Sequence, residues 1–484
     1  MRWWWNGRHT ILRGWRGDPC EFKSRSAHHL RIFSLFLIPF PLIYAKILTI
    51  NKTKHWDNSI PHKRETMYLQ EQLRRTKASK GVLATLPHNV RVGVLRDCAE
   101  LLLESQSAIL KANQEDLNAA KDFNLSSAMM ERLELNPKKI MGMAESLHQI
   151  ADFPDPLNKI MGGFTNHCGL RIEKVSVPLG VIATIYESRP NVTSDVAALC
   201  FKSGNACVLK GGKEAQRSNE AIMQVFHQTL KKYNLPLDCM VLLPFMQDRE
   251  ELKELLGAKD SIDLVIPRGG EGLIRFVTEY AKVPVIKHDK GVCHIFAHHT
   301  CKIPESIAVI VNAKTSRPST CNACETLLID DVFAKEFLPQ AAQALKQKGT
   351  ILKGDRESCA ILKSCGIVCE EILLEDYHRE YGENILNLRI VKGLEEALEH
   401  IEEFGSGHSE AILSEDYGTI EHFLNAVDSA CVYANASTRF SDGGEFGYGA
   451  EVGISTTKIH ARGPMGVESL TIYKYKVYGN GQVR

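Results

Sequence analysis

Short apolar runs alternate with amphipathic stretches along the chain from Met67 onward. The nearly continuous apolar run at residues 181–185 predicts a strand that is covered on both faces. Apolar residues at helical spacing then predict a helix over residues 193–202, and the pair Gly204-Asn205 supplies its stop. This order of strand and helix is typical of α/β proteins with mostly parallel sheets.

The same unit recurs along the rest of the chain. Further strands are predicted at residues 207–209, 262–266, 283–286, 326–329 and 388–391. Further helices are predicted at residues 92–103, from about residue 214, and at 269–280, 332–346 and 394–403. A break near residue 290 favours two successive α/β domains. Residues 171–177 and 470–478 alternate at period two, which predicts half-exposed antiparallel strands of the kind that serve as assembly edges.

Composition narrows the class of protein. At 484 residues the chain is long enough for two or three domains, and 44% hydrophobic and 24% charged residues are typical of globular proteins. A net charge of +1 means that the chain lacks the excess of positive charge that is typical of nucleic-acid-binding proteins. The 14 cysteines are scattered rather than dense, which argues against a disulfide scaffold. Cys321 and Cys324 form a C-x-x-C without a second pair at zinc-finger spacing, so bound zinc is not expected, and a redox dithiol is the lesser alternative.

The first 66 residues differ in composition from the rest. All five tryptophans lie there, and residues 32–45 form an apolar run shorter than the ~20 residues that a membrane-spanning helix needs. Three interpretations remain open: an upstream stretch that is not made in the cell, with Met67 as the start; a targeting or anchoring segment; and a genuine extra element.

Two turns between a strand and a helix are candidates for binding a phosphate group. No G-x-G-x-x-G follows a predicted strand, so the standard dinucleotide fingerprint is absent. Instead, Lys210, Gly211 and Lys213 follow one strand, and Gly269-Gly270 follow the next. Glycines let backbone N–H groups approach a phosphate, and a helix N-terminus favours its charge. The alternative is a pair of ordinary tight turns with solvated basic residues.

Cys321 is the candidate nucleophile. It lies in a polar loop beside the start of a predicted strand, and the basic residues Lys314 and Arg317 precede it. Positive charges favour the thiolate, which is the reactive form of cysteine. The alternative is a small, partly buried residue without a chemical role.

Several longer blocks resemble the gamma-glutamyl phosphate reductase family. They occur in order over essentially all of residues 67–484, which makes the resemblance specific. The blocks lie at residues 178–193, 202–206, 314–323, 440–447, 449–455 and 458–466.

The resemblance implies an aldehyde-dehydrogenase fold of α/β class, with parallel sheets and a small assembly module of β-strands. The implied domains are an NADPH-binding domain at 67–289, with an excursion near 160–178 to the assembly module, a catalytic domain at 290–468, and a C-terminal assembly strand at 469–484. Residues 1–66 lie outside this fold.

The resemblance also implies roles for individual residues. Cys321 resembles the family nucleophile, Lys210 the lysine that holds the adenosine ribose, and Glu380 the glutamate that grips the nicotinamide ribose. Gly269 lies where a backbone amide approaches the pyrophosphate, and Asn191 is the candidate oxyanion-hole amide. Lys213 stands where many NAD-using relatives carry a glutamate, which favours NADPH because an ammonium attracts its 2′-phosphate.

The implied reaction is the NADPH-dependent reduction of L-glutamyl 5-phosphate to L-glutamate 5-semialdehyde through a thioester, in proline biosynthesis. Lys314, Arg317 or Arg439 would neutralise the phosphate or the substrate carboxylate. Further expectations are a cytoplasmic homo-oligomer, a dimer or tetramer, and functional coupling to glutamate 5-kinase. The rival interpretations are a CoA-dependent acyl reductase of the same fold and a non-catalytic family member.

Two departures from related families bear on the chemistry. Hydrolytic aldehyde dehydrogenases carry a glutamate base where residues 286–291 here contain none. Loss of that base fits a thioester that is meant for reduction, because a base would activate water against it. Cys324 replaces a usually apolar residue, either as a packing substitute or as a resolving thiol for oxidised Cys321.

Overall fold

The computed structural model describes residues 60–484 apart from 122–124, 126, 245, 247–248 and 288–289. The chain divides into two units, Met1–Ile60 and Pro61–Arg484, and the account below concerns the second. Most of the extension predicted at residues 1–66, with its apolar run, lies outside the described residues. Residues 60–66 begin a helix, α2 (Ile60–Thr85), that continues past Met67. Among the described helices, none is long and apolar enough to cross a membrane.

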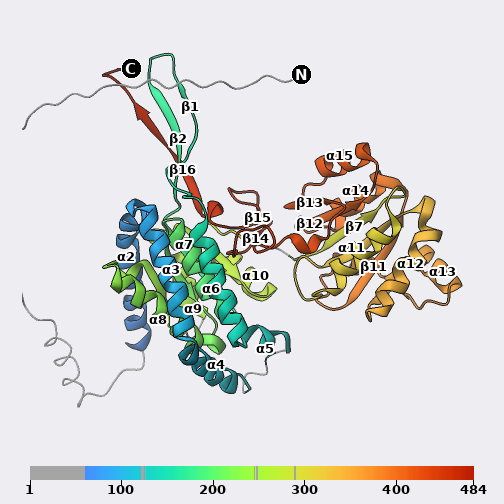
Figure 1. Cartoon of the computed structure of the whole chain (residues 1–484), viewed down its shortest axis with the longest axis horizontal. Helices are drawn as coiled ribbons and strands as arrows, with labels where there is room; N and C mark the ends of the chain where they lie inside the picture. The colour runs from blue at the N-terminus through green and yellow to red at the C-terminus, as the bar shows by residue number, and fades with distance from the viewer. Residues whose placement is uncertain (1–59, 122–124, 126, 245, 247–248, 288–289) are drawn as a thin grey trace, which may run out of the picture. The chain divides into compact units, whose positions relative to one another are not determined.

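The first sheet has four parallel strands in the order β5-β4-β3-β6. Its central strand β3 is buried at all six positions, as its apolar run predicts. The core of this part also includes residues of helices that lie around the sheet (Figure 1). The bounds are β3 (Val181–Tyr186), β4 (Ala206–Lys210), β5 (Met240–Leu242), β6 (Leu264–Arg268), α3 (His88–Glu104), α6 (Pro137–Asp152), α7 (Pro190–Lys202), α8 (Gln216–Lys232) and α10 (Glu271–Tyr280).

The predicted stop of α7 is confirmed. Gly204 has a φ of +73°, a left-handed conformation that glycine adopts without strain. The strand predicted at 283–286 is wrong in extent, because it reduces to a single bridge between Val285 and Val265. Pro284 lies in the middle of that segment and has no N–H to donate to a ladder.

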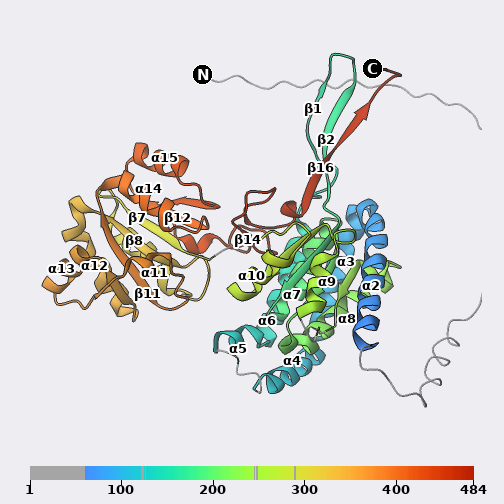
Figure 2. The ribbon, with the colours of Figure 1, turned by 180° about the vertical axis from the view of Figure 1, so that it is seen from behind.

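The second sheet has seven parallel strands in the order β10-β9-β11-β8-β7-β12-β13. Helices lie on both of its faces (Figures 1 and 2). The strands are β7 (Cys293–Ala297), β8 (Cys324–Asp330), β9 (Ile351–Gly354), β10 (Glu370–Glu371), β11 (Ile385–Val391), β12 (Ser409–Leu413) and β13 (Cys431–Ala434). The helices are α11 (Ile303–Thr315), α12 (Ala334–Gln347), α13 (Arg356–Ser364), α14 (Gly393–Phe404) and α15 (Tyr417–Ala426).

Successive residues of these strands belong to different cores. In β8, Leu327 and Ile329 pack in the core that contains residues of α12, while Leu328 packs in the core that contains residues of α14 and α15. Side chains of a strand alternate between the two faces of the sheet, so a strand with an apolar core on each side is apolar at most of its positions. This is why the runs at 326–329 and 388–391 could be recognised as strands.

The two predicted antiparallel strands pair with each other. β2 (Arg171–Pro178) and β16 (Thr471–Tyr478) are in register along their whole length, and β1 (Ile160–Thr165) pairs with the other edge of β2. Figure 1 shows the three strands side by side. Several apolar side chains of this sheet are exposed, among them Phe164 and Tyr475.

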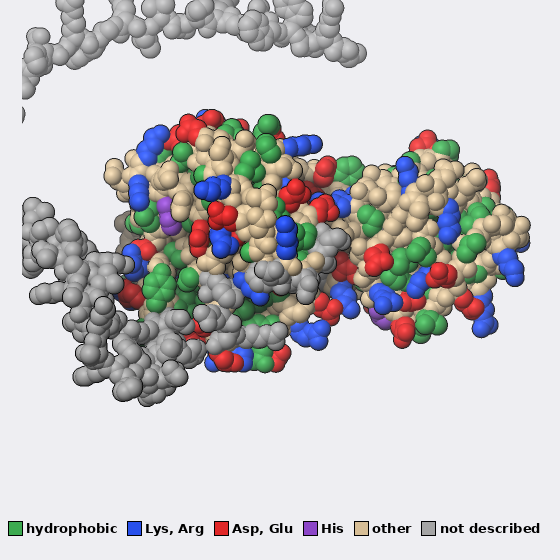
Figure 3. Space-filling view, turned by 90° about the horizontal axis from the view of Figure 1, so that it is seen from below, with side chains coloured by type: hydrophobic (Ala, Val, Ile, Leu, Met, Phe, Trp, Pro, Cys, Tyr) green, Lys and Arg blue, Asp and Glu red, His purple; other side chains and the backbone are tan. Residues whose placement is uncertain are grey.

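The C-terminal stretch returns to the first part of the fold. Residues that were expected in the catalytic domain contribute to the core of the first sheet, including Val452, Met465 and Val467, and so does Leu470 of the expected assembly strand. The short pair β14 (Ile454–Ser455) and β15 (Gly463–Pro464) lies in this stretch. On the face drawn in Figure 3, basic and acidic side chains are interspersed, as the balanced composition leads one to expect.

Candidate active site

A cavity of about 1060 Å³ brings together residues from the loops of both sheets. Of the residues predicted to form a site, Cys321, Gly269, Gly270 and Glu380 line it, whereas Lys210, Gly211, Lys213 and Asn191 do not. Its lining also includes Glu187, Ser188, Arg189, Arg268, Lys287, Lys290, Arg317, Asn322, His378, Arg439, Asp442 and Glu451.

The loop that carries Cys321 is fixed by its neighbours in the chain and by the segment 438–441. Asn322 Nδ2 donates to the carbonyl oxygens of Ser441 (2.9 Å) and Arg439 (3.2 Å). Thr438 Oγ1 donates to the Asn322 carbonyl oxygen at 2.7 Å, and the Arg439 guanidinium donates to the Asn322 side chain. These bonds hold the backbone on one side of Cys321, so the position of its sulfur does not depend on a free loop.

Gly291 packs directly against the backbone of Cys321. A Cβ atom at Gly291 would overlap the Cys321 carbonyl group, so no larger residue fits there. The N–H of Gly291 donates to Glu380 Oε2 at 2.9 Å, which places the Glu380 carboxylate in the cavity close to the cysteine loop. Gly291 therefore connects the candidate nucleophile with the candidate ribose ligand.

The electrostatics of Cys321 differ from the prediction. Burial raises the pKa of the Cys321 thiol to about 12, and the negative charge of Glu451 adds to this shift. Arg268 and Arg189 oppose it, but they do not outweigh burial. The positive charges of Arg268 and Arg189 thus favour the thiolate of Cys321, but in the protein without ligands burial outweighs them.

Lys314 has a different environment from the one expected. It lies in the last turn of α11, fully buried, with its Nζ 2.8 Å from Glu325 Oε2. Burial raises the pKa of Glu325 to about 8, and Lys314 opposes that shift. Lys314 also lowers the pKa of Cys324, while burial raises that of Cys324 by more. Lys314 therefore compensates a buried carboxylate and is not available to a substrate anion.

Arginines gather around Cys321 in the cavity. Burial, together with the positive charges of Arg268 and Arg132, lowers the pKa of Arg189 to about 10. Arg439 and Arg317 also interact electrostatically with one another, and Arg439 with Cys321. Arg317 lies 3.9 Å from Glu131, and Arg439 Nε donates to Ser316 Oγ at 3.1 Å. Such a group of like charges is suited to a ligand that carries more than one negative charge.

Sequence reasoning missed Arg189 and Arg268 as candidates. Each is the last basic residue before a predicted helix that follows a buried strand. Parallel strands bring their carboxyl ends to one edge of the sheet, so these two arginines and the glycine turn lie near each other. The position of both arginines just after the carboxyl ends of predicted parallel strands could therefore have identified them as candidates.

The turn at Gly269-Gly270 leads into α10, as predicted. Gly270 is the N-cap of the helix, and its N–H donates to Glu187 Oε2 at 2.9 Å. A carboxylate therefore occupies the helix N-terminus, where the partial positive charge of the helix attracts an anion.

The other glycine turn lies at the end of β4. Lys210 is partly buried, its Nζ donates to the Gly211 carbonyl oxygen at 3.1 Å, and burial lowers its pKa. Lys213 is exposed at the start of a short helical turn, Lys213–Ala215, that precedes α8. In the ladder, Lys210 is paired with Ile185 of β3, while Arg268 of β6 is paired with Tyr186. The two turns thus flank the end of the same central strand.

Asn191 lies in the first turn of α7 and is exposed. Its Nδ2 donates to Asp195 Oδ2 at 2.9 Å, one helical turn further along. Burial raises the pKa of Asp195 to about 7. With its amide engaged along the helix, Asn191 is outside the cavity wall, and its oxyanion role stays a prediction.

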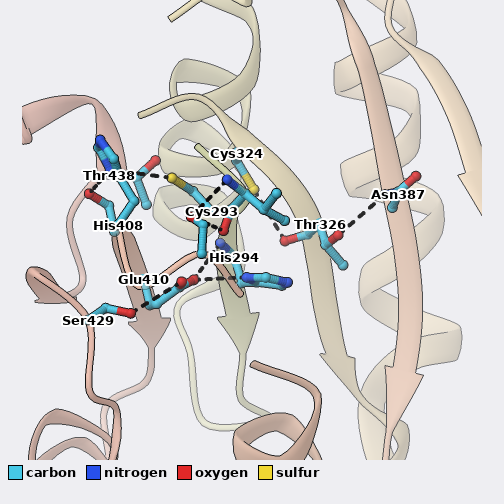
Figure 4. A network of polar contacts seen from close by, with 12 residues as sticks. Cys293, His294, Cys324, Thr326, Asn387, His408, Glu410, Ser429 and Thr438 are labelled. Atoms are coloured by element: carbon cyan, nitrogen blue, oxygen red, sulfur yellow. Dashed lines mark hydrogen bonds and ion pairs between the residues drawn. The ribbon is translucent and has the colours of Figure 1, made fainter. Parts of the chain in front are cut away.

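A buried polar network lies beneath the cysteine loop (Figure 4). Cys293 Sγ donates to the Cys321 carbonyl oxygen at 3.2 Å. The next residue, His294, forms a fully buried ion pair with Glu410, with 3.0 Å between Nδ1 and Oε2. Cys324 is fully buried and donates to the Thr326 carbonyl oxygen at 3.3 Å. This bond inside its own strand supports the packing interpretation of Cys324.

Comparisons with known proteins agree with this architecture. No family model matches the chain. A gamma-glutamyl phosphate reductase from Nautilia profundicola is 50% identical over 416 residues, which cover 86% of this chain and 100% of the relative. The crystal structure of a gamma-glutamyl phosphate reductase from Thermotoga maritima matches with a TM-score of 0.82 at 39% identity, covering 86% of this chain and 99% of that one.

A more distant structure bears on the fold alone. An acetylating aldehyde dehydrogenase from Geobacillus thermoglucosidasius matches with a TM-score of 0.63 at 19% identity, over 87% of this chain and 98% of that one. The predicted aldehyde-dehydrogenase fold is thereby confirmed. Given the identity over the whole length of its relatives, the chain belongs to the gamma-glutamyl phosphate reductase family of oxidoreductases.

Proposed function

We propose that the protein reduces L-glutamyl 5-phosphate to L-glutamate 5-semialdehyde through a thioester on Cys321, with NADPH as the reductant. The observation that carries this proposal is the sharing of one cavity by Cys321 and several arginines. Burial and mutual repulsion already disfavour the charge on Arg189. The negative charge of a bound phosphate compensates both effects, so binding of a dianion is favoured beside Arg189.

The substrate carries two anionic ends, a phosphate and an α-carboxylate, and the arginines suit both. Arg189 and Arg268 approach Cys321 from the first sheet, whereas Arg317 and Arg439 belong to the second part of the fold. A substrate held between the two groups places its acyl carbon near the sulfur. Because the sulfur and the acyl carbon are held next to each other, the attack becomes an effectively unimolecular step.

The thiolate of Cys321 is the attacking form, and because burial raises the pKa of the thiol, the substrate phosphate is the group that accepts its proton. Its sulfur attacks the acyl carbon, the bond to phosphate breaks, and the departing phosphate takes up the thiol proton. The backbone N–H of Cys321 would stabilise the tetrahedral oxyanion, a contact worth roughly 3–4 kcal/mol. Asn191 remains the candidate second donor.

The residues around the cavity fit a nicotinamide dinucleotide. Glu380 could bind ribose hydroxyls, and the N-terminus of α10 at Gly269 and Gly270 suits a pyrophosphate, provided that the Glu187 carboxylate moves away from Gly270. Lys210 would hold the adenosine ribose, and Lys213 the 2′-phosphate. When bound, NADPH supplies the hydride that reduces the thioester. The resulting tetrahedral species on Cys321 then releases the aldehyde and the thiolate, which takes up a proton from solvent to recover the thiol.

The reverse reaction tests this function. Purified protein with L-glutamate 5-semialdehyde and NADP⁺ should form NADPH only when inorganic phosphate is present, and Cys321→Ser should abolish the reaction. CoA should not replace phosphate. Activity that requires CoA and ignores phosphate would establish the rival acyl reductase, and inactivity under every condition would favour the non-catalytic alternative.

The arginine group has its own test in the same assay. Arg189→Met should raise the Michaelis constant for phosphate roughly tenfold to a hundredfold, the equivalent of the about 1.5–3 kcal/mol of a hydrogen bond to a charged group. Arg74→Met is the matched control, because Arg74 is an exposed arginine paired with Glu71 on α2. Equal effects of the two substitutions would remove Arg189 from the phosphate site.

A further inference from the structure

Two cysteines that do not line the cavity lie in unusually close contact. Cys359 is on α13, and Cys369 immediately precedes β10, the edge strand of the seven-stranded sheet. Their sulfur atoms are 2.9 Å apart. Non-bonded carbon atoms rest at about 3.5–4.0 Å, and sulfur is larger, so this approach is closer than ordinary packing.

The surrounding structure holds both thiols in place. Asp355 Oδ1 accepts the Ser358 N–H at 2.7 Å as the cap of α13, and its Oδ2 accepts the Ile390 N–H of β11 at 2.9 Å. The helix that carries Cys359 is thus anchored to the sheet. A Cβ atom at Gly354 would approach the sulfur of Cys369 to 2.9 Å and that of Cys359 to 3.4 Å. The absence of a side chain at Gly354 makes room for the pair.

We propose that Cys359 and Cys369 are an oxidisable pair that forms a reversible disulfide with a small disulfide such as glutathione disulfide. The thiolate of Cys359 attacks one sulfur of the oxidant and releases one glutathione thiolate. The thiolate of Cys369 then attacks the mixed disulfide at Cys359 and releases the second. Two cysteines are oxidised, one glutathione disulfide is reduced to two glutathiones, and the two thiol protons end on these products.

The location of the pair suits this reaction. Both side chains are partly exposed, so a small oxidant can reach them. The pairing also differs from the C-x-x-C in the sequence, because Cys324 is fully buried and donates to Thr326 within β8.

The disulfide would fasten a weakly held strand. β10 consists of Glu370 and Glu371, both exposed, and pairs only with β9 among the described strands. From β10 the chain runs through the turn Leu374–His378 to Glu380, which lines the cavity. Oxidation joins the start of this segment to α13, so amide hydrogen exchange in β10 should become slower.

Mass spectrometry of the full-length protein tests the proposal. After treatment with glutathione disulfide, the intact mass should fall by two hydrogens, and dithiothreitol should restore it. Trypsin cuts after Arg356, Lys363 and Arg379, so Cys359 and Cys369 fall in separate peptides, 357–363 and 364–379. The oxidised protein should yield these two peptides joined, with Cys321 still a free thiol.

Variants identify the partner within the second peptide. Cys365 is exposed and lies in the same peptide as Cys369, so Cys365→Ser should still form the link. Cys369→Ser should form only a mixed disulfide with glutathione. A link that is lost in Cys365→Ser, or stable glutathione adducts on both Cys359 and Cys369 of the unsubstituted protein, would overturn the assignment. Both of these contradicting outcomes are measured on proteins that retain Cys369, so they do not depend on whether Cys369→Ser folds.

Discussion

Arg268 forms an ion pair with Glu451, with 3.4 Å between Nη2 and Oε1, in the cavity that contains Cys321. Arg268 ends β6 of the first sheet, and Glu451 lies in the C-terminal stretch that returns to that sheet's core. The two charges act in opposite directions on the cysteine, because Glu451 raises the pKa of Cys321 and Arg268 lowers it. The pair therefore sets part of the reactivity of the proposed nucleophile.

Substitution of Glu451 should make Cys321 more reactive. Glu451→Gln removes a charge that opposes the thiolate, so alkylation of Cys321 by iodoacetamide should become faster. One pKa unit changes the thiolate fraction about tenfold, and we expect a gain of roughly threefold to tenfold at pH 8. Arg268→Gln should slow the reaction for the opposite reason. The rates are measured by peptide mass without substrate or nucleotide, and changes of the same sign in both variants would contradict the account.

The pH dependence of alkylation follows from the raised pKa. With a pKa of about 12, Cys321 is almost entirely a thiol between pH 7 and 10. The thiolate fraction, and with it the rate, should rise about tenfold per pH unit across this range without levelling off. Iodoacetamide labelling of Cys321 at a series of pH values checks this. A plateau below pH 9 would show that the thiolate is already favoured in the protein without ligands.

The features that the sequence could predict are those set by local pattern. The run at 181–185 predicts β3 because every position of that strand is buried. Period-two alternation likewise predicts β2 and β16. The features that the sequence predicts incorrectly are those that depend on contacts between residues distant in the chain. Lys314 precedes Cys321 closely in the sequence, yet in the structure it is buried and pairs with Glu325.

The arrangement of the cavity likewise depends on contacts that a local sequence pattern does not predict. Cys321, Gly269 and Glu380 could be named from the resemblance, but the arrangement of Arg189 with Arg268 depends on how two strands meet in one sheet. The contact of Cys359 with Cys369 depends on the packing of α13 against the sheet edge. No local pattern distinguishes these two cysteines from the others in the chain.

Cofactor preference should depend on Lys213. Lys213→Glu replaces a charge that attracts the 2′-phosphate of NADPH with one that repels it. The Michaelis constant for NADPH should rise roughly tenfold or more, as expected for loss of a charged hydrogen bond, while that for NADH should change little. Lys231→Glu makes the same charge change in the last turn of α8 and should affect neither constant. Equal effects of Lys213→Glu on both cofactors would show that Lys213 does not read the phosphate.

Stability should depend on the buried pair of His294 and Glu410. Both side chains are fully buried, and burial raises the pKa of Glu410 while His294 opposes this. His294→Ala removes the imidazole that pairs with the buried carboxylate and leaves it only the backbone N–H of residue 294 and the Ser429 hydroxyl, which should lower the free energy of unfolding by about 3–5 kcal/mol. His422→Ala, which removes an exposed histidine 3.7 Å from Glu395, should cost roughly 0–1 kcal/mol. Urea unfolding measures the free energy of unfolding of the two variants. Equal losses would mean that the buried pair contributes no more to stability than the exposed one.

The central claim is that an acyl group is transferred to Cys321, and intact-protein mass spectrometry tests it most directly. L-Glutamyl 5-phosphate is generated in place by glutamate 5-kinase and ATP, with no NADPH present, so that the thioester cannot be reduced. The protein should gain the mass of one glutamyl acyl group, located on Cys321 by peptide mapping and removed by hydroxylamine. Cys321→Ser should gain no such group, whereas Cys324→Ser should still gain it. An acyl group on Cys324, or an unmodified protein that nevertheless consumes the substrate once NADPH is added, would contradict the account.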